Sequence, residues 1–380
     1  MPDVLLVTDF LFAGGVERQV TELALRLRHQ NYRPHVLCLY GEKANRPPHF
    51  LTRLQDADVP VTLLDLDWDA GSKIRGWWEI IRAAHRIRPD ILHAWNYHSN
   101  LLSRLARPWL PRRLRLVGSV RAAYTAKQLL YERLGWRLCT TIVCNSEYIK
   151  KQLTNRARIP AERIVCVQNG VDIERFGTAP NPADVAAFRG EASQVVAYLG
   201  RIARDKSPHH LAHAFGLLKQ QERLPADTRL LIVGEIQEAS AQAMLDQIIE
   251  QFGLAEDVRQ HPPTLSPESV YHAADVMGLT SPSEGQSNVL IEALAAGCPV
   301  VVFDSANRAG VIEHGITGWV VPAGDVARLA EALYEALTLP TARREEMRSA
   351  CLRRAQEFSM DKMVEGYVGL YTRIMPGVTG

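Results

Sequence analysis

The chain has 380 residues, which is long for a single hydrophobic core and predicts two domains. Its 47% hydrophobic and 23% charged residues are typical of a globular protein, and no apolar run reaches the about 18 residues that a membrane-spanning helix needs. The six cysteines show no CxxC pair and no metal-ligand spacing, and the N-terminus carries no basic leader. These features favour a cytoplasmic protein with reduced thiols over a secreted or membrane-spanning one.

The net charge of +2 hides an asymmetry between the two halves of the chain. Residues 1–175 contain 27 Lys and Arg against 17 Asp and Glu, whereas residues 176–380 contain 17 against 25. A basic first half predicts an anionic partner. Nucleic acid is disfavoured because no aromatic-basic recognition motif is present, which leaves anionic lipid or a phosphorylated acceptor.

Strands and helices alternate along the first half. Apolar strands are predicted at residues 4–8, 35–39, 61–64, 117–120, 141–145 and 164–167, and another begins at Ile91. This alternation predicts a parallel, doubly wound sheet. Gly14 and Gly15 lie between the first strand and a helix over 16–29, where glycines let the backbone approach a phosphate, although a tight turn is the simpler interpretation.

Polar side chains lie at the carboxyl ends of these strands. His93 and His98 lie in the segment that leaves the strand at Ile91, and Arg121 follows the strand at 117–120. Open α/β sheets bind ligands at this edge, so the three residues are candidates for ligand contact. A structural role is the alternative for each histidine, and two histidines five residues apart do not predict a metal site without further ligands.

Residues 101–121 are basic and partly apolar. Leucines and Trp109 interleave with six arginines and no acidic residue; the arginines are Arg104, Arg107, Arg112, Arg113, Arg115 and Arg121. A solvated helix and loop would explain this composition. The alternative is a surface that docks on anionic lipid head groups, which would place the protein peripherally on the inner face of a membrane.

Turn-forming residues at 177–182 predict a linker into a second domain. Its first strand, at 195–199, is followed by Gly200, Arg201 and Lys206, which place two cations at the carboxyl end of a strand. An exposed basic loop is the alternative interpretation. A further strand is predicted at 230–233, and His261 lies in the segment 258–263.

Residues 276–303 are the most informative stretch. A strand at 276–279 leads through Glu284 into a helix that Ser283 or Ser287 could cap and that ends at Gly297. The first amides of this helix favour a phosphate; they belong to Ser287, Asn288 and Val289. Glu284 and Glu292 are eight residues apart, which is about 12 Å along a helix. The two catalytic carboxylates of a glycosidase lie closer together, about 5–9 Å apart, because they flank a single bond. The pair better fits the two ends of one elongated ligand, such as a sugar, a diphosphate and a ribose in a row.

The pattern Glu-x7-Glu followed by Ala-Leu-Ala-Ala-Gly-Cys-Pro-Val-Val resembles the signature of the retaining GT-B glycosyltransferases of family 4, the glycosyl transferases group 1. Gly-Arg-x4-Lys from Gly200 to Lys206 and Gly-Gly-x-Glu from Gly14 to Glu17 are similar to two further family motifs. The chain departs from the family at Arg121, where a histidine is usual, and around His261, where Phe-Leu-Gly is usual.

The resemblance implies an α/β protein with the GT-B fold, in which two Rossmann-like, doubly wound parallel-sheet domains face a cleft. We expect an acceptor-side domain at residues 1–176 with 361–380 and a nucleotide-sugar-binding domain at 177–360. The implied catalytic residues are Glu284, Arg201 and Lys206. The implied donor-binding residues are Gly14, Gly15, Gly200, Arg201, Lys206, His261, Glu284, Gly285, Ser287, Asn288, Val289 and Glu292, and those on the acceptor or sugar side are Glu17, His93, His98 and Arg121.

The implied reaction transfers a hexose-type sugar from a nucleotide diphosphate sugar to a hydroxyl of a lipid-linked or saccharide acceptor, as in bacterial polysaccharide, glycolipid or glycoconjugate biosynthesis. It retains the anomeric configuration and needs no cofactor or metal. Asp65, Asp67 and Asp69 mimic the DxD metal motif of another large glycosyltransferase fold, and we interpret them as a polar loop. The alternatives are a nucleotide-sugar epimerase or hydrolase on the same fold and a non-catalytic nucleotide-sugar-binding protein.

Overall fold

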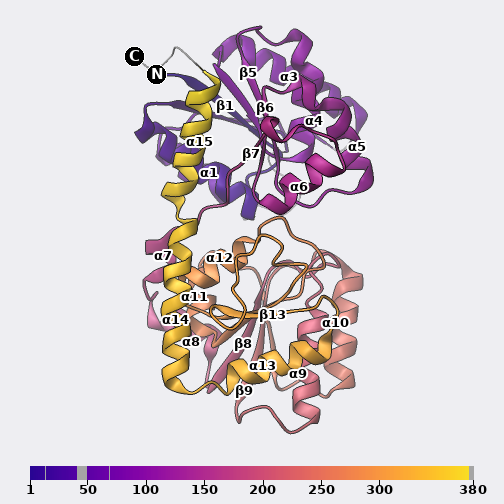
Figure 1. The fold of residues 1–380 in the computed structure, drawn as a ribbon, viewed down its shortest axis with the longest axis vertical. Coiled ribbons are helices and arrows are strands. Elements are labelled where there is room, and N and C mark those ends of the chain that lie inside the picture. Colours follow the sequence, from indigo (N-terminus) through magenta and orange to yellow (C-terminus); the bar gives the residue numbers. More distant parts are fainter. Residues whose placement is uncertain (13, 41–48, 68, 376–380) are drawn as a thin grey trace. The chain divides into compact units, whose positions relative to one another are not determined.

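The computed structural model describes residues 1–12, 14–40, 49–67 and 69–375. These residues form two compact units (Figure 1). The first consists of Met1–Asn169 and Met360–Gly380, and the second of Gly170–Ser359. The chain thus leaves the first unit, builds the second, and returns to the first.

The described part of the first unit contains a parallel sheet with the strand order β3-β2-β1-β4-β5-β6-β7. The strands are β1 (Asp3–Thr8), β2 (Arg33–Cys38), β3 (Val61–Leu63), β4 (Ile91–Ala94), β5 (Arg115–Val120), β6 (Thr141–Cys144) and β7 (Ile164–Cys166). Both faces of this sheet are buried. Val4 and Leu6 of β1 pack into one core while Leu5 and Val7 pack into the other, because successive side chains of a strand point to opposite faces.

Helices cover both faces of this first sheet. They are α1 (Gly15–Leu27), α2 (His49–Asp56), α3 (Ala70–Ile87), α4 (Tyr97–Ala106), α5 (Ala126–Gly135), α6 (Glu147–Asn155) and α15 (Met360–Ile374), with short 3-10 helices η1 (Arg28–Gln30), η2 (Arg107–Trp109), η3 (Trp136–Leu138) and η4 (Ala161–Arg163). The C-terminal helix α15 packs beside α1 (Figure 1), and its buried Met363, Tyr367 and Tyr371 complete one of the two cores.

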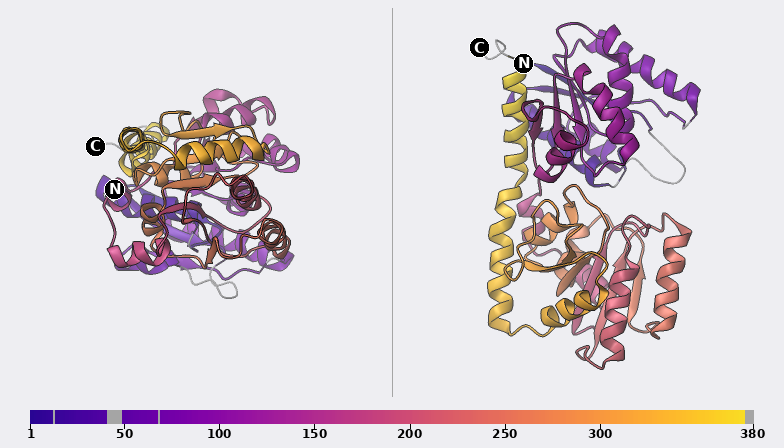
Figure 2. Two further views of the ribbon diagram at one scale, coloured as in Figure 1. Left: turned by 90° about the horizontal axis from the view of Figure 1, so that it is seen from below. Right: turned by 45° about the vertical axis from the view of Figure 1, so that its right-hand side comes forward.

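The second unit contains a parallel sheet with the order β10-β9-β8-β11-β12-β13, and helices lie on both of its faces (Figure 2). Its strands are β8 (Gln194–Leu199), β9 (Thr228–Val233), β10 (Val258–His261), β11 (Val276–Leu279), β12 (Val300–Phe303) and β13 (Gly318–Val321). Its helices are α7 (Ile173–Gly177), α8 (Pro182–Arg189), α9 (His209–Gln220), α10 (Ala239–Gln251), α11 (Pro267–Ala273), α12 (Asn288–Ala295), α13 (Val326–Leu337), α14 (Thr341–Ala355) and the 3-10 helix η5 (Gln356–Phe358). The strand order reverses between β8 and β11, and in open α/β sheets ligands bind at such a point.

The boundary between the units differs from the expected one. It lies between residues 169 and 170 rather than between 176 and 177, because the intervening segment packs on the second unit. Val171 pairs with Ser359, and the ring of Phe176 on α7 lies 5.8 Å from that of Tyr271 on α11. On the C-terminal side the first unit resumes at Met360, one residue earlier than expected.

Candidate functional site

A lysine and a glutamate meet at the carboxyl edge of the second sheet. Lys206 Nζ lies 2.5 Å from Glu284 Oε1, and their side chains are 22% and 14% exposed. Lys206 lies in the loop after β8 and Glu284 in the loop after β11, and these two strands are neighbours in the sheet. The sheet topology therefore brings together two residues that are 78 positions apart in the sequence.

Arg201 lies in the same loop as Lys206 but does not share its partner. Its side chain is half-exposed, bonds the carboxylate of Asp205 at 2.8 Å and also bonds Gln237. The hydroxyl of Tyr198 donates to the Arg201 carbonyl at 2.7 Å and holds the loop in place. Burial, together with the negative charge of Glu284, raises the pKa of Tyr198, so this hydroxyl stays protonated as a donor. The edge thus presents two paired cations, of which Arg201 is the more exposed.

Two glycines permit the close approach of the loops that follow β8 and β9. A Cβ on Gly234, which follows β9, would collide with the carbonyl oxygen of Gly200, which follows β8. A Cβ on Gly200 would lie 3.0 Å from the hydroxyl of Tyr198. Gly200 and Gly234 thus have a local steric reason to lack side chains.

Helix α12 begins at Asn288, directly after the Glu284 loop. Ser287 is its N-cap residue with an extended backbone, but the Ser287 hydroxyl forms no capping bond among the described residues. The prediction that the hydroxyl of Ser283 or Ser287 caps this helix is therefore wrong. Gly285 and Ser287 are buried, so the start of the helix lies against the loop. A helix start that lacks a side-chain cap favours an anionic ligand near its amides.

Glu292 lies inside α12 and is buried. The hydroxyl of Tyr271 on α11 donates to Glu292 Oε2 at 2.8 Å. This bond fixes the carboxylate, which is the group expected to hold the donor ribose. Sequence reasoning did not identify Tyr271, because a tyrosine on a neighbouring helix carries no local motif.

His261 is the last residue of β10. Its ring lies 4.8 Å from the ring of Phe188, and its Nδ1 lies 2.8 Å from the Pro262 carbonyl oxygen. The imidazole therefore packs on α8, and its predicted role in donor binding stays a prediction.

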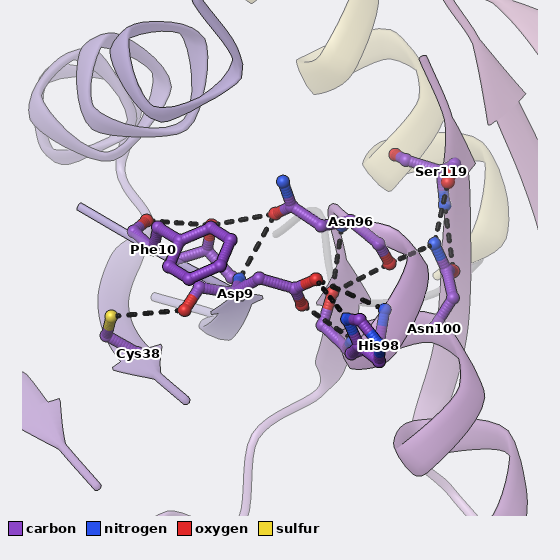
Figure 3. Close-up of polar contacts among 9 residues, drawn as sticks. Asp9, Phe10, Cys38, Asn96, His98, Asn100 and Ser119 are labelled. Carbon is purple, nitrogen blue, oxygen red and sulfur yellow. Dashed lines mark hydrogen bonds and ion pairs between the residues drawn. The ribbon is translucent and has the colours of Figure 1, made fainter. Parts of the chain in front are cut away.

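At the carboxyl edge of the first sheet, Asp9 organises a polar cluster (Figure 3). Asp9 is 3% exposed, and its Oδ1 accepts the amide of Ser99 at 2.7 Å. Its Oδ2 accepts the amide of His98 at 3.2 Å and lies 3.2 Å from His98 Nδ1, so the imidazole points at the carboxylate. Asn96 Oδ1 accepts the Asp9 amide and the Thr8 hydroxyl. These bonds tie the end of β1 to the start of α4.

Of the predicted acceptor-side residues, His98 remains at the surface, with its side chain 28% exposed. Asp9 was missed by the sequence analysis. The available signal was its position: it directly follows a buried strand, at the edge where such sheets bind ligands.

His93 does not reach the surface. It is fully buried on β4, with Nδ1 2.7 Å from the Tyr371 hydroxyl and Nε2 2.7 Å from the Ser119 hydroxyl. Burial, and the nearby charge of Arg121, hold the pKa of His93 well below its usual value, so the ring is neutral. The expectation that His93 contacts a ligand is therefore wrong, because both ring nitrogens are used inside the core.

Arg121 is buried as well. Its guanidinium donates to the Tyr367 hydroxyl at 2.6 Å and to Asn169 Oδ1 at 2.5 Å, and it lies 4.5 Å from the ring centroid of Trp95. It thus anchors α15 rather than presenting a charge to an acceptor, which corrects the prediction for this residue.

Glu17 and Gly14 lie at the start of α1. Gly14 is the N-cap residue, and a Cβ there would collide with the Glu17 carboxylate, which folds back over the glycine. Gly15 begins the helix. The absence of a side chain at Gly14 therefore makes room for Glu17, and the predicted contact of this loop with the donor stays a prediction.

The Asp-rich segment has a structural role where it is described. Asp69 caps α3, with Oδ1 accepting the Ser72 amide at 2.8 Å and Oδ2 accepting the Ser72 hydroxyl at 3.0 Å. Residue 68, between Asp67 and Asp69, lies outside the described residues. Within residues 1–12, 14–40, 49–67 and 69–375, no group of three or more His, Cys, Asp or Glu side chains is placed to hold a metal ion.

The basic stretch 101–121 is not uniformly exposed. Arg104 is buried and forms a two-pronged ion pair with Glu132 at 3.0 and 2.8 Å, and Arg121 is buried as described above. Arg112, Arg113 and Arg115 are exposed. Two of the six expected surface arginines thus belong to the core. In the part of the chain that the structure describes, no helix is both long and apolar enough to cross a bilayer.

Two protein-family models match the chain. The model described as Glycosyltransferase Family 4 matches residues 13–175, and the model described as Glycosyl transferases group 1 matches residues 185–357. Among curated proteins, a D-inositol 3-phosphate glycosyltransferase from Pseudarthrobacter chlorophenolicus is 35% identical over 202 residues, which cover 49% of this chain and 47% of that protein. The chain spans about half the length of the curated relatives it matches.

Solved structures share the fold over almost the whole chain. A glycosyltransferase from Rickettsia africae gives a TM-score of 0.83 at 18% identity, with 99% of each chain covered. Anabaena Alr3699/HepE in complex with UDP and glucose gives a TM-score of 0.84 at 20% identity, covering 98% of this chain and 100% of that one. At these identities the similarity is one of fold.

Proposed function

This chain belongs to the group 1 glycosyltransferases and has their GT-B fold, and from that premise we propose that it transfers a hexose-type sugar from a nucleoside diphosphate donor to an acceptor hydroxyl, with retention of configuration. The observation that carries the proposal is the pairing of Lys206 with Glu284 at the carboxyl edge of the second sheet, beside Arg201 and the start of α12. This edge combines a carboxylate for sugar hydroxyls with cations and helix amides for a diphosphate.

In this proposal each group at the edge binds one part of the donor. Glu284 accepts hydrogen bonds from the sugar hydroxyls, while Lys206, Arg201 and the first amides of α12 hold the diphosphate. Glu292, oriented by Tyr271, accepts from the ribose hydroxyls. A donor of the UDP-sugar class is supported by the similar fold of Anabaena Alr3699/HepE, which was solved with UDP and glucose.

The chemical step follows from where charge develops. As the anomeric bond loosens, negative charge grows on the leaving diphosphate, and Lys206 and Arg201 are cations that stabilise it there. A diphosphate oxygen takes the proton of the acceptor hydroxyl, so no side-chain base is required. No metal takes part in this scheme, and EDTA is therefore expected to leave initial rates unchanged; a loss of activity that Mg²⁺ or Mn²⁺ restores would contradict it.

Acceptor recognition is assigned to the first unit. Asp9 and His98 lie at the carboxyl edge of its sheet, where the imidazole is partly exposed and held by the carboxylate. His98 can hydrogen-bond an acceptor hydroxyl, and Asp9 positions it. The acceptor is a saccharide or a lipid-linked sugar, as in polysaccharide, glycolipid or glycoconjugate synthesis.

The test begins with calorimetry of UDP-, GDP- and ADP-sugars on the whole protein, followed by product analysis with and without acceptors. Binding of one nucleotide sugar, and transfer that depends on an acceptor, is the expected result. Turnover of the donor without any acceptor would instead indicate an epimerase or hydrolase, and binding without product would indicate a nucleotide-sugar-binding protein. Inversion at the anomeric carbon, seen by NMR, would contradict retention.

A further inference from the structure

An open groove of about 230 Å³ lies on the first unit between α4 and α5. Carbon atoms form most of its wall. Its apolar lining comes from Leu101 and Leu105 on α4, Tyr131 and Leu134 on α5, and Leu138 on η3. Pockets for whole small molecules usually measure about 300–1,000 Å³, so this groove fits one apolar part of a larger ligand.

The charged residues of the groove already satisfy one another. Arg104 and Glu132 also line it, but they form the buried two-pronged ion pair, and Arg104 Nε donates to Cys139 Sγ at 3.3 Å. Both side chains are less than a tenth exposed. A charged ligand group would therefore have to break this pair, whereas a hydrocarbon chain would not.

The walls of the groove expose large apolar side chains. Leu134 is 70% exposed and Leu105 is 54% exposed, and Leu130, one helical turn before Leu134 on α5, is exposed as well. Leu130, Leu134 and Leu138 follow the spacing of one helix face. Several large apolar side chains left exposed near one groove favour a binding site over an ordinary solvated face.

The surroundings of the groove are positively charged. Residues 97–140 contain nine Lys and Arg but only one acidic residue, Glu132, and its charge is already paired with Arg104. Lys127, Arg133 and Arg137 are exposed on α5 and η3. An apolar groove within such a basic stretch complements an amphiphile that has a hydrocarbon chain and an anionic head group.

One residue of the groove lies next to the edge assigned to the acceptor. Tyr97 lines it, and the ring of Tyr97 lies 5.3 Å from that of His98, which is bonded to Asp9. We propose that the α4–α5 groove binds the hydrocarbon chain of an anionic, lipid-linked acceptor and directs its head group to His98. This inference rests on the proposed function, because it names the acceptor class for the same transfer site.

The experiment measures binding of monomeric dodecyl phosphate to the whole protein by calorimetry, below its micelle concentration. The variant Leu105→Gln with Leu134→Gln makes the groove polar without changing its charge. We expect it to weaken dodecyl phosphate binding by about tenfold or more, because two leucine contacts are lost. The matched control, Leu265→Gln with Ile316→Gln, changes two equally exposed residues of the second unit and should bind as the wild type does.

A second variant tests the exposed basic residues of α5 and η3. Arg133→Gln with Arg137→Gln should weaken dodecyl phosphate binding and remove much of its salt dependence, while a neutral dodecyl ether binds as it does to the wild type. The proposal is overturned if the wild type does not bind dodecyl phosphate, if inorganic phosphate binds equally well, or if the control pair loses as much affinity as the groove pair.

UDP-glucose binding, measured on the same samples, separates this inference from the proposed function. Wild-type protein that binds a nucleoside diphosphate sugar but no alkyl phosphate would overturn the groove and leave the proposed function intact. Protein that binds dodecyl phosphate in the groove but no nucleotide sugar would overturn the proposed function, and with it the assignment of the bound chain to an acceptor.

Discussion

The two sheets have the same parallel architecture, but their carboxyl edges use charge differently. At the edge of the second sheet, Arg201, Lys206 and Glu284 remain partly exposed in two loops. In the first unit the corresponding polar residues turn inward: His93 and Arg121 bond the tyrosines of α15 inside the core. One edge therefore leaves its charged side chains partly exposed, and the other uses His93 and Arg121 to join the C-terminal helix to the sheet.

The difference shows that position at a strand end does not by itself make a residue a ligand contact. His93 points into a core that α15 completes, so one of its two ring nitrogens bonds Tyr371, 278 residues away, and the other bonds Ser119 on a neighbouring strand. Lys206 and Glu284 lie in loops beyond the strand ends, where both side chains stay partly exposed. If charge in the first unit is mainly structural and charge in the second mainly functional, substitutions in the first should chiefly lower stability and those in the second should chiefly lower activity.

The largest effect is expected in the core of the first unit. Arg104→Met leaves Glu132 as an unpaired buried carboxylate, which should lower the free energy of unfolding by about 3–5 kcal/mol in urea denaturation. Arg223→Met, which breaks the exposed two-pronged pair with Glu331, is the control and should cause no comparable loss. Adding Glu132→Leu to the first variant should recover much of the stability; a mild effect of Arg104→Met would refute the structural role.

Lys206→Ala should be the most damaging change for activity in the second unit. It removes a cation from the proposed diphosphate site and leaves Glu284 without its partner, so kcat/KM should fall by about 10²–10³. Lys219→Ala is the control, because Lys219 pairs with Asp257 elsewhere on the same unit. Near-normal steady-state rates in a folded Lys206→Ala protein would remove this residue from the proposed site.

Tyr271→Phe should have a smaller effect, confined to the donor. The change removes the hydroxyl that orients Glu292, and a hydrogen bond to a charged group is worth about 1.5–3 kcal/mol. We expect donor affinity, measured by calorimetry, to fall by about tenfold while the free energy of unfolding changes less. Unchanged donor affinity would mean that Glu292 does not contact the ribose.

The smallest effect concerns pH and the first unit. In the folded protein the His93 ring stays neutral at pH values below the usual histidine pKa. In the unfolded chain the same ring takes up a proton below about pH 6.5. His93 therefore makes folding less favourable as pH falls below about 6.5, by at most about 1.4 kcal/mol per pH unit. Urea unfolding at pH 7.5 and 5.5 should show a weaker pH dependence in His93→Gln than in the wild type; equal dependence in both would contradict this.

Much of the second unit could be predicted because its signals are local. The helix after Glu284, its end at Gly297 and the buried strands on either side follow from apolar spacing and from a glycine with positive φ. The capping hydroxyl could not be predicted, since whether Ser287 turns toward its own helix depends on the loop that buries it. Asp9 escaped notice because one aspartate after a strand forms no motif until α4 packs against it.

By itself, the sequence determined the alternation of strands and helices, the two-domain organisation and the residues of the second edge, because short-range patterns and motifs specify them. Only the tertiary structure decided which residues at the strand ends stay exposed at the sheet edge and which point into the core. It turned His93 and Arg121 inward and buried Arg104 against Glu132, since these partners come from distant segments of the chain. It also left the α4–α5 groove open, because no other described part of the first unit covers those leucines.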